Sequence, residues 1–117
     1  IWHKELWLID HGAALYFHHS WDNWGQQAQK PLFLVKDHVL LPWATELEQV
    51  HEEFMAILDE QKIEAVIKLI PDDWLEEDSN FNSRDEHRKA YARFLAIRLS
   101  HSAIFLKEAQ HARSVLI

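Results

Sequence analysis

From residue 46 onward, apolar residues recur every three or four positions, and this period constrains the fold more than any other feature of the sequence. It predicts a first helix over 46–58, with Thr45 as its N-cap. The apolar face of this helix consists of Leu47, Val50, Phe54, Ile57 and Leu58. A second short helix begins after the capping residue Asp59 and ends near Pro71. Its apolar face consists of Ile63, Val66, Ile67 and Ile70.

A capping box predicts the start of a third, longer helix. Ser83 would be the N-cap and Glu86, three residues later, would bond back to the cap. The helix continues to about His111, a length of roughly 40 Å at 1.5 Å per residue. Its apolar stripe consists of Tyr91, Phe94, Leu95, Leu99, Ser102, Phe105 and Leu106. The acidic loop before it, 72–82, carries three expected anchors, Trp74, Leu75 and Phe81.

The first 44 residues follow no helical period. Residues 1–9 are rich in β-branched, aromatic and aliphatic side chains, and they predict a β-hairpin whose second strand is 5–9. Asp10-His11-Gly12 then forms a turn, because Gly12 can adopt a positive φ. Residues 13–44 form an irregular aromatic region, with a turn at 22–25 and a short strand near 31–35.

The expected fold class is therefore mainly α: an N-terminal β-hairpin and an aromatic loop region, followed by three helices. The 117 residues fit a single domain, divided into the hairpin and Asp10 turn (1–12), the irregular aromatic segment (13–44) and the helical part (45–117). The 48% hydrophobic content and six tryptophans exclude wholesale disorder. No apolar run reaches the ~18–20 residues of a membrane span.

Charge, cysteine and glycine content narrow the classes of function. With 19 acidic against 12 basic residues, the chain lacks the basic surplus typical of a nucleic-acid-binding surface. Two glycines allow no P-loop and no G-x-G-x-x-G motif. The absence of cysteine excludes disulfides and thiolate metal sites. A cysteine-free chain suits a reducing compartment, so we expect a cytoplasmic protein.

Two groups of side chains are candidate metal ligands. Asp10 ends a predicted strand directly before a glycine turn, where a carboxylate can bind a metal; the alternative is that it caps the turn or pairs with a cation. The second group is four histidines close in sequence to Asp10, Asp22 and Asp37: His11, His18, His19 and His38. Mixed histidine and carboxylate ligands suit zinc, iron or manganese. No H-x-x-x-H or H-E-x-x-H spacing occurs, so the alternative is scattered structural histidines.

The run 6–21, LWLIDHGAALYFHHSW, resembles a segment of bacterial HipA-like kinases, small members of the protein-kinase-like superfamily. Residues 37–42 and 91–98 are similar to the helical C-terminal part of these kinases, and the resemblance covers essentially the whole chain. It implies that Asp10-His11-Gly12 occupies the D-F-G position after a β-hairpin. Asp10 would then bind the Mg²⁺ that bridges the phosphates of ATP. Because His11 replaces the usual Phe, the Phe-in, Phe-out switch of ordinary protein kinases is not expected.

The resemblance also implies what the chain lacks. The ATP-anchoring Lys, the catalytic base and its Asn would precede Ile1, and the start at Ile1 favours a C-lobe piece of a longer protein. We expect a parent that transfers phosphate from ATP to Ser or Thr of a protein. The isolated chain would have no catalytic residue, no tightly bound ATP or Mg²⁺ and no activity. Its partners would be the missing N-terminal part and a protein substrate, and exposed apolar surface would favour self-association. The alternative is a stand-alone helical protein-interaction module without catalysis.

Overall fold

The computed structural model of the chain describes Lys4, residues 15–75 and residues 80–116, and every regular element in these residues is a helix. The α-helices are α1 Trp24–Gln27, α2 Leu47–Ile57, α3 Glu60–Ile67, α4 Arg84–Ser100 and α5 Ser102–Leu116. The short 3-10 helices are η2 Tyr16–His19, η3 Phe33–Asp37, η4 Leu41–Trp43 and η5 Asp72–Trp74. The expectation of a mainly α fold is confirmed.

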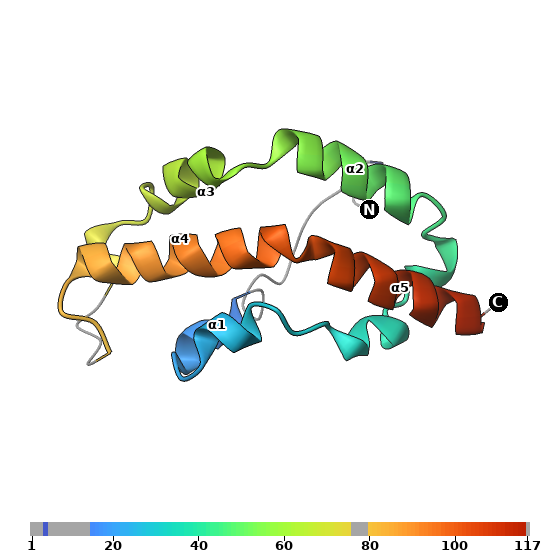
Figure 1. Ribbon diagram of the computed structural model, residues 1–117, viewed down its shortest axis with the longest axis horizontal. Coiled ribbons are helices and arrows are strands. Elements are labelled where there is room, and N and C mark those ends of the chain that lie inside the picture. Colours follow the sequence, from blue (N-terminus) through green and yellow to red (C-terminus); the bar gives the residue numbers. More distant parts are fainter. Residues whose placement is uncertain (1–3, 5–14, 76–79, 117) are drawn as a thin grey trace.

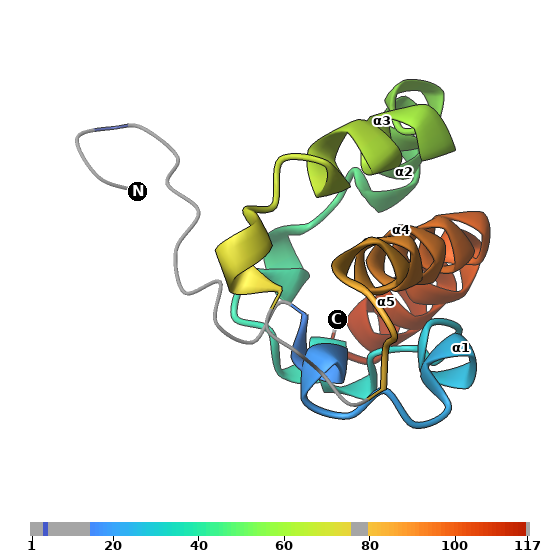
Figure 2. The same cartoon turned by 90° about the vertical axis from the view of Figure 1, so that its left-hand side faces the viewer.

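Helices α4 and α5 run end to end through the middle of the molecule and separate two layers (Figure 1). Helices α2 and α3 lie on one side, and the short helices of residues 16–43 lie on the other, an arrangement that the end-on view also shows (Figure 2). Helix α3 contacts α4 and α2 contacts α5. On the other side α1 contacts α4, while η3 and η4 contact α5. Each half of the central rod is therefore covered by different elements.

Side-chain caps begin two of the helices as predicted. The Asp59 carboxylate accepts a hydrogen bond from the backbone N–H of Lys62 at 2.7 Å and so begins α3. Ser83 Oγ accepts from the backbone N–H of Glu86 at 3.1 Å and begins α4. The Glu86 carboxylate reaches back to the backbone N–H of Asn82 at 2.9 Å. This differs from the predicted capping box by one residue, because the return bond goes to the residue before the cap.

The prediction of three helices is wrong, since the described residues from 45 onward form four α-helices. The expected third helix is broken at His101 into α4 and α5. Ser100 Oγ donates to the carbonyl of Ile97 at 2.8 Å, and His101 Nδ1 lies 2.9 Å from the same oxygen. The backbone N–H of His101 also bonds to this carbonyl, at 3.1 Å. Side chains that compete with the backbone for one carbonyl bend or end a helix.

The first 44 residues bear out some expectations and overturn one. The β-hairpin at 1–9 and the Asp10 turn lie outside the described residues. The strand expected near 31–35 is wrong, because Phe33–Asp37 forms η3. A strand needs a pairing partner, and the described residues offer none. The turn at 22–25 is confirmed: Asn23 has a φ of 54°, a left-handed conformation that Asn tolerates.

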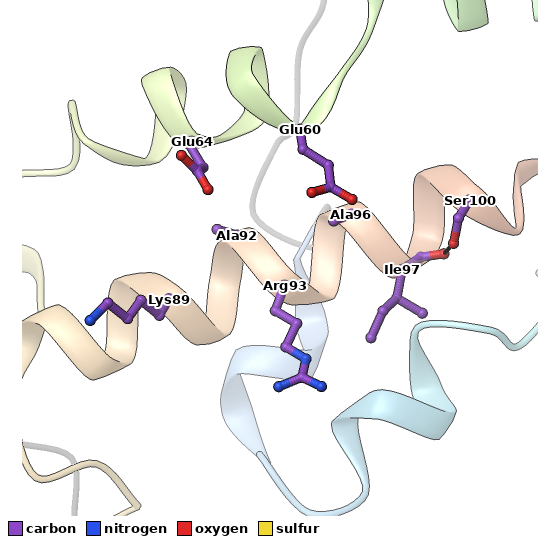
Figure 3. Close-up of a pocket in the computed structure, with 8 residues that line it drawn as sticks. All are labelled: Glu60, Glu64, Lys89, Ala92, Arg93, Ala96, Ile97 and Ser100. Carbon is purple, nitrogen blue, oxygen red and sulfur yellow. Dashed lines mark hydrogen bonds between the residues drawn. The ribbon is translucent and has the colours of Figure 1, made fainter.

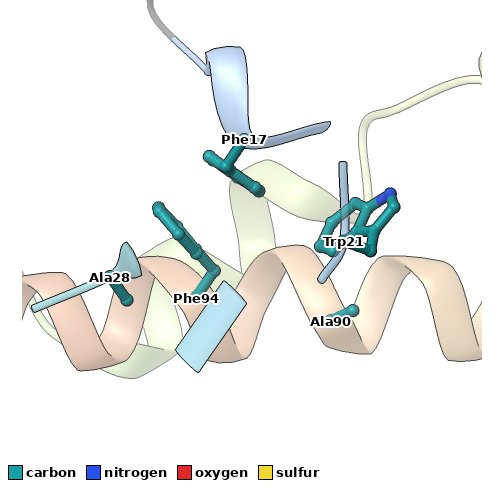
Figure 4. Packing of buried hydrophobic residues seen from close by; sticks show 5 residues of the cluster. All are labelled: Phe17, Trp21, Ala28, Ala90 and Phe94. Carbon is teal, nitrogen blue, oxygen red and sulfur yellow. The ribbon is translucent and has the colours of Figure 1, made fainter. Parts of the chain in front are cut away.

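The larger core cluster joins α4 to the segment that contains η2 and α1 (Figure 4). Its buried residues are Phe17, Trp21, Ala28, Ala90 and Phe94. Partly buried aromatic and aliphatic side chains surround them, namely Trp24, Phe81, Tyr91, Leu95 and Ile97. Burial of a large apolar side chain stabilises a fold by about 1.5–3 kcal/mol. This cluster is therefore the main source of stability that ties the start of the described chain to α4.

A smaller cluster joins α5 to η3, η4 and the start of α2. Leu41, Ala109 and Ala112 are buried there, and Val35 and Leu47 pack against them. Two of the three buried side chains are single methyl groups, so this cluster removes little apolar surface from water. The molecule thus has two separate small cores, one on each half of the central rod.

Helix α2 leaves much of its apolar face exposed. Helix α2 begins at Leu47, with Glu46 rather than Thr45 at its N-cap, and it contains no buried residue. Its position on the outside of α5 leaves much of the apolar face uncovered. The radius of gyration, 16.2 Å, exceeds the ~13 Å of a compact domain of this length. The described chain is an open arrangement whose apolar surface is only partly covered by its own elements.

Candidate functional site

The metal ligand expected from the sequence, Asp10, lies outside the described residues, as does His11. The segment that follows Asp10 along the chain is anchored by Phe17, which is 3% exposed. The Phe17 ring stacks on Phe94 with ring centroids 3.5 Å apart, and it meets Tyr91 edge-on at 5.7 Å. The chain is therefore fixed to α4 seven positions after Asp10.

A second anchor follows at Trp21. Its indole ring meets four rings edge-on, with centroid distances of 5.4 Å to Phe17, 4.8 Å to Phe81, 5.2 Å to His87 and 5.0 Å to Tyr91. The His87 ring is itself stacked between Phe81, at 4.3 Å, and Tyr91, at 5.1 Å. Edge-on and offset-stacked pairs are the favoured aromatic geometries. Phe17 and Trp21 thus fix the irregular aromatic segment to α4.

The histidine and aspartate group expected from the sequence is only partly described. His19 and His38 are exposed, as are Asp22 and Asp37. His38 Nδ1 accepts from the backbone N–H of Leu40 at 3.3 Å, which is a local turn contact. Residue 18 lies in η2, and nothing is described of its side chain. Within Lys4, 15–75 and 80–116, no three His, Cys, Asp or Glu side chains lie close enough together to hold a metal ion.

An aspartate–arginine cluster fixes the connection between α3 and α4. The Arg88 guanidinium donates to the Asp72 carboxylate and also, at 2.8 Å, to the carbonyl of Ile70. Arg84 Nη1 lies 3.9 Å from the second oxygen of Asp72. The hydrogen bond from Arg88, together with the charges of Arg88 and Arg84, lowers the pKa of Asp72 below its ordinary value of 3.8. Among the loop residues expected as anchors, Leu75 is buried, but Trp74 is 77% exposed.

An open cavity of about 400 Å³ lies between α3 and α4. Glu60 and Glu64 extend from α3 toward α4, whereas Lys89 and Arg93 extend from α4 in other directions (Figure 3). The floor is formed by small and apolar residues of α4, namely Ala92, Ala96, Ile97 and Ser100. Their spacing of four residues places Glu60 and Glu64 on one face of α3, and Lys89 and Arg93 on one face of α4. The sequence alone did not indicate that α3 and α4 are neighbours.

Exposed apolar side chains are concentrated in the segment 32–43, which covers η3 and η4. The most exposed are Val39, at 82%, and Trp43, at 80%. The others are Leu32, Phe33, Leu34 and Leu40. Contiguous exposed apolar surface of this kind is typical of a surface that contacts another protein or another domain.

No family model, curated protein or solved structure matches this chain. None of the helices in the described residues is long and apolar enough to cross a membrane.

Proposed function

We propose that this chain is the C-terminal, helical part of the C-lobe of a HipA-like kinase, a bacterial cytoplasmic enzyme that transfers phosphate from ATP to Ser or Thr of a protein. The observation that carries the proposal is the run 6–21 with Asp10-His11-Gly12 in the D-F-G position. The mainly helical architecture after this run supports it, because a kinase C-lobe is also helical beyond its metal-binding aspartate.

In this proposal Asp10 is the metal-binding residue of the chain. A carboxylate oxygen is the hard ligand that Mg²⁺ prefers, so the donor chemistry suits the ion. Bound Mg²⁺ would neutralise charge on the phosphates of ATP. The aromatic anchor on α4 supports this role, because Phe17 holds the segment that leads away from Asp10 against a rigid helix.

The exposed segment 32–43 also supports the proposal. Trp43 and Val39 would be costly to leave in water, and in the full kinase the preceding part of the parent is available to cover them. The parent would supply the Lys that anchors ATP, the catalytic base and its Asn.

The test is the replacement of Asp10 by Asn in the full-length parent. Loss of the carboxylate charge should reduce phosphate transfer about 10²–10³-fold, the usual effect of removing one group that stabilises transition-state charge. Asp22→Asn is the control, because Asp22 is exposed and follows the same aromatic segment. An Asp10→Asn parent with normal transfer would show that the metal assignment is wrong. Transfer by the purified 117-residue chain would equally contradict the proposal, since the catalytic base is assigned to the parent.

The second candidate is a helical protein-interaction module without catalysis. The same exposed segment favours it, because an exposed Trp and neighbouring Phe and Leu residues are typical of contact surfaces. The source gene distinguishes the two candidates. A D-x-x-x-x-N motif encoded shortly before Ile1, after a nucleotide-binding lobe, would support the kinase; a start codon at or just before Ile1 would support the module.

A further inference from the structure

Helix α2 carries an uncovered apolar row on the outer side of the molecule. Val50, Phe54 and Ile57 are 44%, 56% and 58% exposed. Their spacing of four and three residues places them along one strip of the helix, about 10 Å long at 1.5 Å per residue. We name these three residues the α2 row.

The opposite edge of the apolar face attaches α2 to the rest of the molecule. Met55 Sδ accepts a hydrogen bond from Ser102 Oγ of α5 at 3.2 Å. Leu47 packs against the small core that contains Leu41 and Ala109. Helix α2 therefore lies beside α5 (Figure 1), while the side chains of the α2 row stay exposed.

Two carboxylates share the side of α2 that carries the α2 row: Glu46 lies four residues before Val50, and Glu53 lies four residues before Ile57. The stretch 46–64 contains one lysine, Lys62, and seven acidic residues: Glu46, Glu48, Glu52, Glu53, Asp59, Glu60 and Glu64. Lys62 pairs with Asp59 at 2.9 Å, and no other acid of this stretch forms an ion pair within the described part of the chain. An apolar surface beside negatively charged side chains favours a ligand that is apolar and positively charged.

Several cations of the chain are engaged in contacts of their own, and the acidic charge of α2 argues against a second copy as the occupant. Arg88 is bonded to Asp72, and Lys89 lies 3.9 Å from Asp85. The Arg98 guanidinium lies over the Phe105 ring at 4.1 Å. Two copies that met through α2 would bring like charges together, which is unfavourable.

We propose that the α2 row docks a basic amphipathic helix of a partner protein. The apolar face of the partner helix would cover Val50, Phe54 and Ile57, as in other complexes in which an amphipathic helix lies on an apolar surface. Its Lys and Arg residues would lie opposite the carboxylates of Glu46 and Glu53. The site is distinct from the segment 32–43, which lies in the other layer of the molecule.

The test uses the full-length protein and a synthetic Leu/Lys amphipathic helix of about 18 residues, long enough to be helical. A Leu/Glu peptide with the same apolar pattern is the matched probe. Titration followed by fluorescence anisotropy should show binding of the Leu/Lys peptide and none of the Leu/Glu peptide. Phe54→Ala should weaken binding about tenfold, the effect of losing a central aromatic contact. Glu46→Gln with Glu53→Gln should weaken binding and reduce its dependence on salt concentration.

Phe33→Ala is the control variant. Phe33 is as exposed as Phe54 but lies on η3 in the other layer, so its loss should leave binding unchanged. Both phenylalanines are exposed, and neither substitution should prevent folding. The proposal would be overturned if Phe33→Ala weakened binding of the Leu/Lys peptide as much as Phe54→Ala does. It would also be overturned if Phe54→Ala did not weaken this binding, or if the Leu/Glu peptide bound as tightly as the Leu/Lys peptide. Self-association that Phe54→Ala abolishes would also overturn it, since a second copy would then occupy the α2 row.

Discussion

At the scale of single residues, Asp72 shows how one carboxylate connects two helices. It follows Pro71 after α3, and its partners Arg84 and Arg88 lie in the first turns of α4. Arg88 also bonds to the carbonyl of Ile70, so one guanidinium holds both the side chain and the backbone of the connection. The sequence pattern indicated an acidic loop before a basic helix, but it did not indicate which acid and which base would meet.

The lowered pKa of Asp72 predicts a pH dependence of stability. A carboxyl group whose pKa falls on folding contributes stability above its ordinary pKa of 3.8, and this contribution is lost as the pH falls through the lower folded value. Asp72→Asn should therefore lower the free energy of unfolding at neutral pH, and the difference from the parent sequence should shrink in acid. Urea unfolding followed by tryptophan fluorescence measures this difference.

Asp73→Asn is the control for this measurement. Asp73 lies next to Asp72 but forms no ion pair within the described residues. Its replacement should change stability little at either pH. If Asp72→Asn and Asp73→Asn lowered the free energy of unfolding equally and independently of pH, the contact with Arg88 would not be the cause of the loss of stability.

At the scale of elements, the start of α4 depends on its N-cap. Ser83→Ala removes the hydrogen bond from the backbone N–H of Glu86 and should lower the free energy of unfolding by about 1 kcal/mol. Ser114→Ala is the matched control, because Ser114 is exposed in α5 and its hydroxyl donates to the carbonyl of His111 within the helix. Urea unfolding curves of the two variants make the comparison. A loss from Ser114→Ala as large as that from Ser83→Ala would contradict the assigned role of the cap.

Caps and apolar periods in the sequence predicted where the helices begin better than they predicted which elements pack against them. Asp59 and Ser83 begin α3 and α4 as predicted, because a cap acts within three residues of its own position. The break at His101 was missed, since it depends on how two side chains share the carbonyl of Ile97. The apolar period of α2 was identified, but a period cannot indicate whether another element covers the face. Phe54, for example, belongs to this apolar face but is exposed.

The candidate site was less predictable from the sequence than the helices. The histidine and aspartate group of residues 10–38 was proposed because its members are close in sequence, yet its described members are exposed and bring no three possible ligands together. The cavity lined by α3 and α4 was not anticipated, because it depends on which helices are neighbours. Closeness in an irregular segment says little about distance in space, whereas spacing on one helix does.

At the scale of the whole molecule, the uncovered segment 32–43 predicts self-association of the isolated 117-residue chain. Light scattering should show a mass that increases with protein concentration, because association removes Val39 and Trp43 from water. Trp43→Asp should weaken this association about tenfold or more. Trp74→Asp is the matched control, since Trp74 is equally exposed but lies on η5. A strictly monomeric chain at high concentration would contradict the prediction.

The two small cores have a consequence for how the protein is made. Phe17 packs on Phe94, which the ribosome adds 77 residues later (94 − 17 = 77). Leu41 packs in the same way on Ala109 and Ala112, which are also added much later than Leu41 itself. At about 5–20 residues per second, the ring of Phe17 remains without Phe94 for between about 4 and 15 s. During synthesis the aromatic segment is thus available to chaperones, or to neighbouring nascent chains, until α4 emerges and covers it.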